Sequence, residues 1–403
     1  MKKKYRLYSS MPLPLNHKTY AEINLSALKH NYNTMLREIC KDQTEKQVIC
    51  VLKADAYGHG AKDCCRALIE EGCRYFAVSS IEEAIDLREI CNECRSDAEI
   101  LILGYTLPTQ APLLANYNII TSLVDANFAR ELAYEAERAK VKVRCHVKLD
   151  TGMNRIGFSA RNATEVEETV REIIEISKSS CLDICGMFTH LAKADEALDE
   201  ESPHIPSKKQ ADLFIMTDKK LLEAGVNVKF RHICNSAAAL KFPEYRFDAC
   251  RVGITLYGTH SSRYVDRLEL LPVMKLCTVI SHIHTLPKGE SVSYGGTYTA
   301  TEERRIATLP IGYADGFIRA YSGCEVSVVT DDGIKKAAVL GRICMDQCMI
   351  DVTGTDSRVG DKVIIFGNSP KELTALAKIA NTIEYECLCL VTSRVPRIVN
   401  DTQ

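Results

Sequence analysis

The amino-acid sequence predicts an α/β fold, in which a (β/α)8 barrel of the TIM type is followed by a mainly β C-terminal domain. Three observations lead to this prediction. Short apolar runs alternate with longer helical patterns up to about residue 252, a rhythm typical of βα units around a parallel sheet. Beyond about residue 260, Gly, Asp and Pro turns separate the apolar runs, as in antiparallel sheets. The 403 residues are enough for two such domains.

Eight apolar runs in the first part of the chain have the length of buried parallel strands. They lie at residues 48–52, 76–79, 100–103, 119–123, 143–149, 184–189, 229–234 and 249–252. Helical patterns lie between them at residues 61–71, 81–90, 126–139, 163–177 and 208–224. Gly72 and Gly225 follow two of these patterns as helix stop signals. Eight strands with crossover helices over about 250 residues predict a closed barrel.

The second part of the chain has a different pattern. Between residues 271 and 363, turns at 286–289, 331–333 and 359–361 divide the apolar runs, which predicts antiparallel strands. A helix is predicted at 372–380 and a final strand at 387–391, before an arginine-containing tail. We therefore expect an N-terminal lead at residues 1–17, a barrel at 18–262 and a mainly β domain at 263–403.

The charge balance argues against nucleic acid and membrane partners. Lys and Arg number 51 and Asp and Glu number 53, a net charge of −2, so no excess positive charge attracts phosphate backbones or anionic lipids. The N-terminal residues do not have the apolar run of a signal peptide, and no later run is long enough to span a membrane. We therefore expect a cytoplasmic protein. The 18 cysteines are then reduced thiols. Their spacing predicts no metal site.

Reactive side chains follow several of the predicted strands, where barrel enzymes carry their active sites. Lys53 and Tyr57 follow the first strand, Ser236 follows the seventh, and Arg251 and Gly253 lie at the end of the eighth. The lysine amine can condense with an aldehyde, and the hydroxyl and backbone amides can hold a phosphate. Pyridoxal phosphate (PLP) needs both, although a sugar-phosphate enzyme with a covalent lysine would use the same groups.

Eight motifs, in order along the chain, resemble those of the PLP-dependent alanine racemases of fold type III. They are VLKADAYGHG at 51–60, KLDTGMNRIG at 148–157, THLAKAD at 189–195, NSAA at 235–238, RVGITLYG at 251–258, and the segments 292–298, 310–316 and 342–347. The likeness covers residues 20–399. It implies a PLP enzyme that interconverts L- and D-alanine and supplies D-alanine for cell-wall peptidoglycan.

The resemblance also implies which groups are catalytic. Lys53 is similar to the lysine that binds PLP covalently and acts as the base on one face of the substrate. Tyr294 is similar to the tyrosine that acts on the opposite face and reaches the site from the other subunit, which implies a homodimer with shared sites. Racemisation removes a proton from one face of Cα and returns it on the other, so one lysine and one tyrosine supply the two bases.

Binding residues are implied in the same way. Arg251 resembles the arginine at the pyridine nitrogen, and His190 a histidine of its hydrogen-bond network. The phosphate contacts of the family correspond to four residues: Tyr57, Ser236, Gly253 and Ile254. Arg155 resembles the arginine near the substrate carboxylate, while Tyr313 and Met345 resemble residues that the partner subunit presents at the substrate entrance.

Two positions have a special status in this comparison. Lys148 falls where many family members carry a carbamylated lysine. Ser393 stands where a tyrosine commonly precedes the Arg-Val-Pro-Arg tail, contacts the PLP phosphate and narrows the substrate pocket. Either another aromatic group or a water fills that space and alanine stays preferred, or Ser393 binds the substrate and admits serine. The second reading predicts a serine racemase or a dual serine/alanine racemase.

Two further functions stay open at this point. Single-barrel PLP-binding proteins with a similar first-strand lysine act in cofactor homeostasis without catalysis, but Tyr294 and the second domain argue against that function. Basic amino-acid decarboxylases share the plan of a barrel and a β domain. The segments 292–298 and 342–347 belong with racemases instead.

Overall fold

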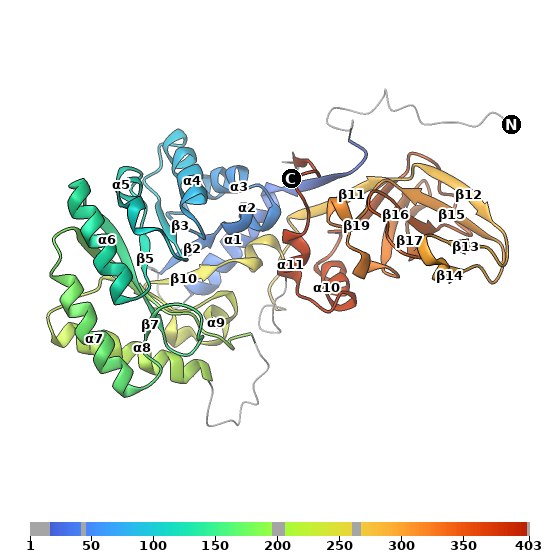
Figure 1. Cartoon of the computed structure of the whole chain (residues 1–403). Helices are drawn as coiled ribbons and strands as arrows, with labels where there is room; N and C mark the ends of the chain where they lie inside the picture. Colours follow the sequence, from blue (N-terminus) through green and yellow to red (C-terminus); the bar gives the residue numbers. More distant parts are fainter. Residues whose placement is uncertain (1–16, 42–45, 196–205, 260–266, 401–403) are drawn as a thin grey trace.

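The computed structural model describes residues 17–41, 46–195, 206–259 and 267–400. A barrel surrounded by helices lies beside a second part built around a β-sheet (Figure 1). This arrangement confirms the predicted fold class. In the described part of the chain, no helix combines the length and the apolar character needed to cross a membrane.

Eight parallel strands of the described residues form the ring of the barrel. They are β2 (Gln47–Val51), β3 (Tyr75–Val78), β4 (Glu99–Ile102), β5 (Thr121–Leu123), β6 (Val143–Asp150), β8 (Leu182–Phe188), β9 (Phe230–His232) and β10 (Ala249–Val252). The ring closes where the Ile120 amide donates to the Ile100 carbonyl at 2.9 Å and the Arg251 amide donates to the Cys234 carbonyl at 2.9 Å. The eight predicted strands are confirmed, with small differences at their ends.

Helices cover the outside of the ring (Figure 1). They are α1 (Leu25–Ile39), α3 (Ala61–Glu70), α4 (Ile81–Glu93), α5 (Ala111–Asn116), α6 (Ala126–Ala139), α7 (Ala163–Ser177), α8 (Pro206–Glu223) and α9 (Ser236–Lys241). Five of them begin where the side chain of an N-cap residue accepts a hydrogen bond from a backbone amide of the first turn; these residues are Asn24, Ser80, Asp125, Asn162 and Asn235. The five predicted helices are confirmed, whereas α1 and the short α5 and α9 were not predicted.

The second part contains a nine-stranded sheet in the order β12-β15-β18-β17-β16-β19-β11-β1-β20. Its strands are β1 (Tyr20–Asn24), β11 (Met274–Val279), β12 (His282–Leu286), β15 (Arg304–Leu309), β16 (Glu325–Thr330), β17 (Gly333–Leu340), β18 (Cys348–Asp351), β19 (Lys362–Phe366) and β20 (Arg397–Asn400). Only β1 and β20 pair in parallel among these strands. Shorter elements are β7 (Phe158–Ser159) beside β6, the hairpin of β13 (Ser291–Val292) and β14 (Tyr298–Thr299), and the helix α10 (Pro370–Ile379).

The structure corrects the assignment of the first strand. β1 lies in the nine-stranded sheet, between β11 and β20, although the range 18–262 was assigned to the barrel. No local pattern reveals this, because both partners of β1 lie more than 200 residues away in the sequence, at Met274–Val279 and Arg397–Asn400. The predicted boundary at residues 262 and 263 lies outside the described residues, as does the lead except for its last residue.

The predicted strand at 387–391 is wrong. These residues begin within the helix α11 (Glu384–Cys389), in which Cys387 and Leu388 are buried side by side. The run Cys-Leu-Cys-Leu-Val has the apolar character of a buried strand, but its first three residues continue the helix that begins at Glu384. The error matters because α11 forms one wall of the largest cavity described below.

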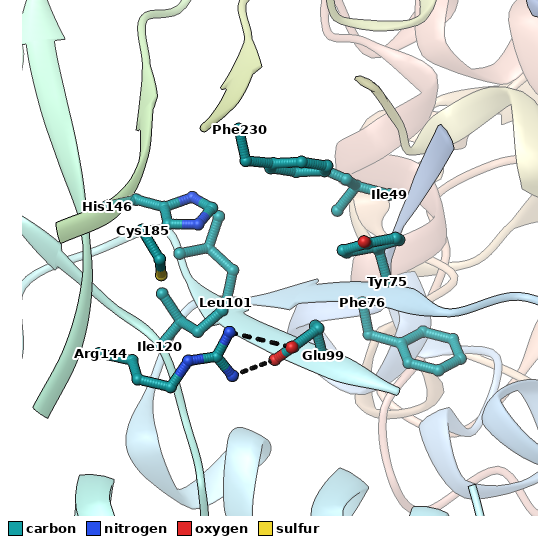
Figure 2. Close-up of a pocket in the computed structure, with 10 residues that line it drawn as sticks. All are labelled: Ile49, Tyr75, Phe76, Glu99, Leu101, Ile120, Arg144, His146, Cys185 and Phe230. Atoms are coloured by element: carbon teal, nitrogen blue, oxygen red, sulfur yellow. Dashed lines mark hydrogen bonds and ion pairs between the residues drawn. The ribbon is translucent and has the colours of Figure 1, made fainter. Parts of the chain in front are cut away.

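A small cavity of about 100 Å³ lies at the amino ends of the barrel strands. Figure 2 shows its apolar and aromatic walls and the ion pair between Arg144 and Glu99. The two guanidinium nitrogens lie 2.5 and 2.9 Å from the two carboxylate oxygens. His146 also lines this cavity and connects it to the barrel interior. In barrels this end serves stability, and catalysis takes place at the other.

Candidate active site

A cavity of about 590 Å³ lies at the carboxyl ends of the barrel strands, between the ring and α11. It brings together eight of the predicted site residues: Lys53, Tyr57, Arg155, His190, Ser236, Arg251, Gly253 and Ile254. Lys148 also lines it. The cavity is also lined by residues to which the sequence analysis assigns no role, among them Asp195, Asn235, Ile383 and Tyr385.

Lys53 begins a left-handed turn, α2 (Lys53–Gly58). The next four residues, 54–57, have φ between 52° and 55° although none is glycine. Such a conformation costs roughly 1–2 kcal/mol for each residue that has a Cβ atom. Surrounding contacts hold the turn: His59 Nδ1 lies 2.8 Å from the Ala56 carbonyl oxygen, and the Ala54 amide donates to Glu83 at 2.7 Å. Strain of this kind collects at functional sites.

Cationic side chains crowd the cavity. Burial lowers the pKa of Lys53, and the nearby Arg155 lowers it further. Burial, helped by Arg251, lowers the pKa of Lys148 to about 7. A lowered pKa increases the fraction of neutral amine, which is the nucleophilic form of a lysine. With two lysines and two arginines on its walls, the cavity attracts anionic ligands.

Ser236, Gly253 and Tyr57 form a polar cradle at the ends of β9 and β10. Ser236 Oγ accepts hydrogen bonds from the Gly253 amide at 3.2 Å and from the Thr255 hydroxyl at 3.0 Å, so its own hydrogen is directed elsewhere. A Cβ atom on Gly253 would lie 2.7 Å from the Tyr57 hydroxyl oxygen, so glycine is required for this close approach. Two hydroxyls and adjacent backbone amides are groups that bind phosphate.

Arg251 is fixed within the barrel. Its Nη1 donates to His232 Nδ1 at 2.8 Å, and its Nη2 donates to the Thr189 carbonyl at 2.7 Å and lies 3.3 Å from His190 Nδ1. Since arginine only donates, both imidazole nitrogens accept. Burial first, and Arg251 second, hold the pKa values of His190 and His232 well below the usual range. Both histidines are therefore neutral near pH 7.

Three predicted site residues lie outside this cavity, on the second part of the chain. Tyr294 begins the turn between β13 and β14, which Figure 1 places at the outer end of the second part. Tyr294 is 70% exposed and Met345 is 53% exposed, and both line a separate open hollow of about 510 Å³. Tyr313 is 39% exposed. Within one chain, these side chains do not meet Lys53.

Ser393 also lies outside the cavity of its own chain, as Tyr294, Tyr313 and Met345 do. It is exposed and is not among the lining residues. The aromatic group in that wall is Tyr385 of α11, whose ring lies 6.0 Å from the ring of Tyr57. The sequence analysis missed Tyr385 because it interprets the adjacent residues as a strand. If these residues are read as a helix instead, Tyr385 can face Tyr57. An aromatic group, Tyr385, thus lines the cavity wall, as expected if alanine stays the preferred substrate.

We therefore expect Ser393→Tyr to leave substrate preference unchanged. An exposed side chain outside the cavity does not discriminate between two small amino acids, so the ratio of kcat/KM for serine and alanine should stay within about twofold, well below the effect of a pocket contact. Steady-state racemisation assays with L-alanine and L-serine measure this ratio. Tyr385→Ser, in the cavity wall, is the contrasting variant and should change it. A severalfold fall in the serine-to-alanine ratio of kcat/KM for Ser393→Tyr would show that Ser393 lines the substrate pocket.

Comparisons with known proteins agree with this geometry. Residues 23–261 match the family model "Alanine racemase, N-terminal domain", and residues 273–399 match "Alanine racemase, C-terminal domain". The chain is 40% identical to alanine racemase 1 of Clostridium acetobutylicum over 94% of both chains. Its structure resembles the alanine racemase of Clostridium difficile with a TM-score of 0.86, at 38% identity over 96% of this chain and 97% of the other. A complex of that enzyme with cycloserine gives 0.84, at 38% identity over 96% of both chains.

Proposed function

The chain belongs to the alanine racemase family and is therefore an amino-acid isomerase, and from that premise we propose how its cavity interconverts L- and D-alanine with PLP. The observation that carries the proposal is the meeting of Lys53, the phosphate cradle and Arg251 in one cavity. The complex of the Clostridium difficile enzyme with cycloserine, a small molecule, supports a small-molecule substrate here.

The residues of the cavity fit PLP. The Tyr57 and Ser236 hydroxyls offer donors to a phosphate, because Ser236 Oγ accepts from the Gly253 amide and the Thr255 hydroxyl and keeps its own hydrogen free to donate. In the bonds described for Arg251, the terminal nitrogens are used and Nε is left as a donor at the cavity wall. Such a donor suits an acceptor such as a pyridine nitrogen. When bound, PLP supplies the electron sink that acidifies the substrate Cα–H bond.

The chain's own residues then have defined tasks. Lys53 binds the cofactor covalently through its amine and moves the proton on one face of the substrate Cα. Arg155, which also lines the cavity, binds the substrate carboxylate by its guanidinium. Burial and the Arg251 guanidinium keep His190 and His232 neutral, so the two histidines hold the arginine in place without adding positive charge.

A second copy of the chain supplies the base on the other face. Tyr294 is exposed and lies outside the cavity of its own chain, and a racemase needs a second base opposite Lys53. We infer that two copies form a homodimer in which Tyr294 of one copy reaches the cavity of the other. Tyr313 and Met345, on the same exposed side of the second part, would then narrow the entrance. A symmetric dimer builds two such sites at once.

The D-alanine product indicates the cellular role of the reaction. We propose that the protein acts in the cytoplasm and that D-alanine is consumed in the synthesis of cell-wall peptidoglycan. The family relation supports this proposal. The same relation, together with the exposed Ser393, favours alanine over serine as the substrate, and favours catalysis over a role in cofactor storage.

Covalent trapping and a racemisation assay test the proposal together. PLP is added to the purified protein and reduced with borohydride, and peptide mapping is expected to place the pyridoxyl group on Lys53. The same preparation, before reduction, should racemise L-alanine faster than L-serine. A label on Lys148, the other lysine of the cavity, would overturn the assignment of Lys53. Cofactor binding without racemisation of either amino acid would favour the non-catalytic function.

A further inference from the structure

The side chain of Arg397 connects the two parts of the chain next to the lysine turn. Arg397 lies on β20, where it pairs with Ala21 of β1. Its Nε donates to the carbonyl oxygen of Gly58 at 2.8 Å, and Gly58 ends the left-handed turn that begins at Lys53. The terminal nitrogens donate to three carbonyl oxygens of the second part: Thr392 at 2.5 Å, Val395 at 2.7 Å and Val391 at 2.7 Å.

The two segments are also in close backbone contact. A Cβ atom on Gly58 would lie 2.9 Å from the Leu388 carbonyl oxygen of α11 and 3.4 Å from Arg397 Nη2. α11 carries Tyr385 into the cavity wall, where its ring lies 6.0 Å from that of Tyr57. One guanidinium thus holds the lysine turn against the helix that forms the facing wall.

An arginine is well suited to this position. Its planar guanidinium presents five N–H donors in a fixed fork, whereas a lysine ammonium is a single point of charge. The four acceptors belong to a left-handed turn and to the chain just after α11, where carbonyl groups have no partner from regular secondary structure. Lysine would keep the charge but would lose most of these bonds.

We propose that Arg397 is a positioning residue for cofactor binding, because it holds the left-handed turn so that Lys53 and Tyr57 face the wall formed by α11. This inference rests on the proposed function, which assigns both residues to PLP. The turn is strained at four successive residues, so it keeps its shape only while external contacts hold it. Loss of the Arg397 hydrogen bonds lets the turn change conformation. The Lys53 amine and the Tyr57 hydroxyl then no longer both face the wall formed by α11.

Arg397→Lys and a matched control, Arg88→Lys, test this inference. Arg88 is buried, whereas Arg397 is half-buried, and Arg88 likewise donates to backbone carbonyls, at 2.9 Å to Tyr117 and 3.0 Å to Asn118, beyond the other end of the barrel. PLP affinity is measured by equilibrium titration of the full chain. Amide hydrogen exchange without added cofactor is measured for peptides that cover residues 53–60. We expect Arg397→Lys to bind PLP about tenfold more weakly, from the loss of two or three hydrogen bonds, and to exchange faster at 53–60. Arg88→Lys should change neither.

Each outcome distinguishes the inference from the proposed function. If the unmodified chain binds no PLP, the proposed function fails. If it does bind, and Arg397→Lys keeps native PLP affinity and native exchange at 53–60, the positioning role is overturned. Equal losses in Arg88→Lys would also overturn it, because they would reflect general destabilisation. If Arg397→Lys does not fold, Gly58→Ala takes its place with the same readouts, since its Cβ would push the turn away from Leu388 while Arg397 stays intact.

Discussion

Chains that carry Lys53→Ala and chains that carry Tyr294→Phe are each expected to be inactive, and mixing them is expected to restore activity. Lys53 lies in the barrel cavity, whereas Tyr294 lies exposed on the second part, in a separate hollow. If each site takes its lysine from one copy and its tyrosine from the other, a mixed dimer contains one intact site. Random exchange of subunits then restores about a quarter of the native activity, measured as racemisation of L-alanine.

The size of the effect makes this test sharp. A positioned acid or base contributes roughly 10²- to 10⁴-fold to a rate, so each parent chain should show little activity. The matched control mixes Lys53→Ala with a chain that carries both substitutions, which yields no intact site. Subunit exchange is verified by capturing mixed dimers through two different tags. Mixed dimers without recovered activity would mean that the site is completed within one chain.

The barrel was predictable because each of its strands has a local signature. The helices between the strands were equally predictable, since the helical patterns at 126–139 and 163–177 match the bounds of α6 and α7. A fully buried strand between two helices needs a continuous apolar run, whichever strands it pairs with. By contrast, β1 pairs with β11 and β20, and nothing in its five residues indicates partners so distant in the sequence.

The site was predictable to the extent that it lies at strand ends. Lys53, Ser236 and Arg251 lie at or just after predicted strands, and the structure brings them into one cavity. Tyr385 was missed because its position depends on the direction in which a short helix faces. The geometry of Arg397 was equally hidden, since its four acceptors are backbone carbonyls and carry no signature in the side-chain sequence.

Acid is expected to unfold this protein steeply below about pH 6.5, because several of its histidines are buried in neutral form. Burial lowers the pKa of His59 to about 4 and that of His146 to about 3, and it holds His190 and His232 well below their usual range. In the unfolded chain, histidine titrates near about 6.5. As the pH falls below that value, the unfolded state takes up protons and the native state does not. The stabilisation is thus complete above pH 6.5 and is lost as the pH falls toward the folded pKa values.

The expected slope is large compared with the stability of a typical protein. Each such histidine removes about 1.4 kcal/mol for each pH unit, so four together can remove about 5 kcal/mol between pH 6 and pH 5, against a total of roughly 5–15 kcal/mol. The free energy of unfolding from urea titrations at pH 7.5, 6.5, 5.5 and 4.5 measures this slope. His59→Asn, which keeps a side-chain donor near the Ala56 carbonyl, should be less stable at pH 7.5 but should reduce the proton uptake on unfolding by about one. A free energy of unfolding that stays level from pH 6.5 to 5, or NMR signals of protonated buried imidazoles in the native state at pH 5.5, would contradict the prediction.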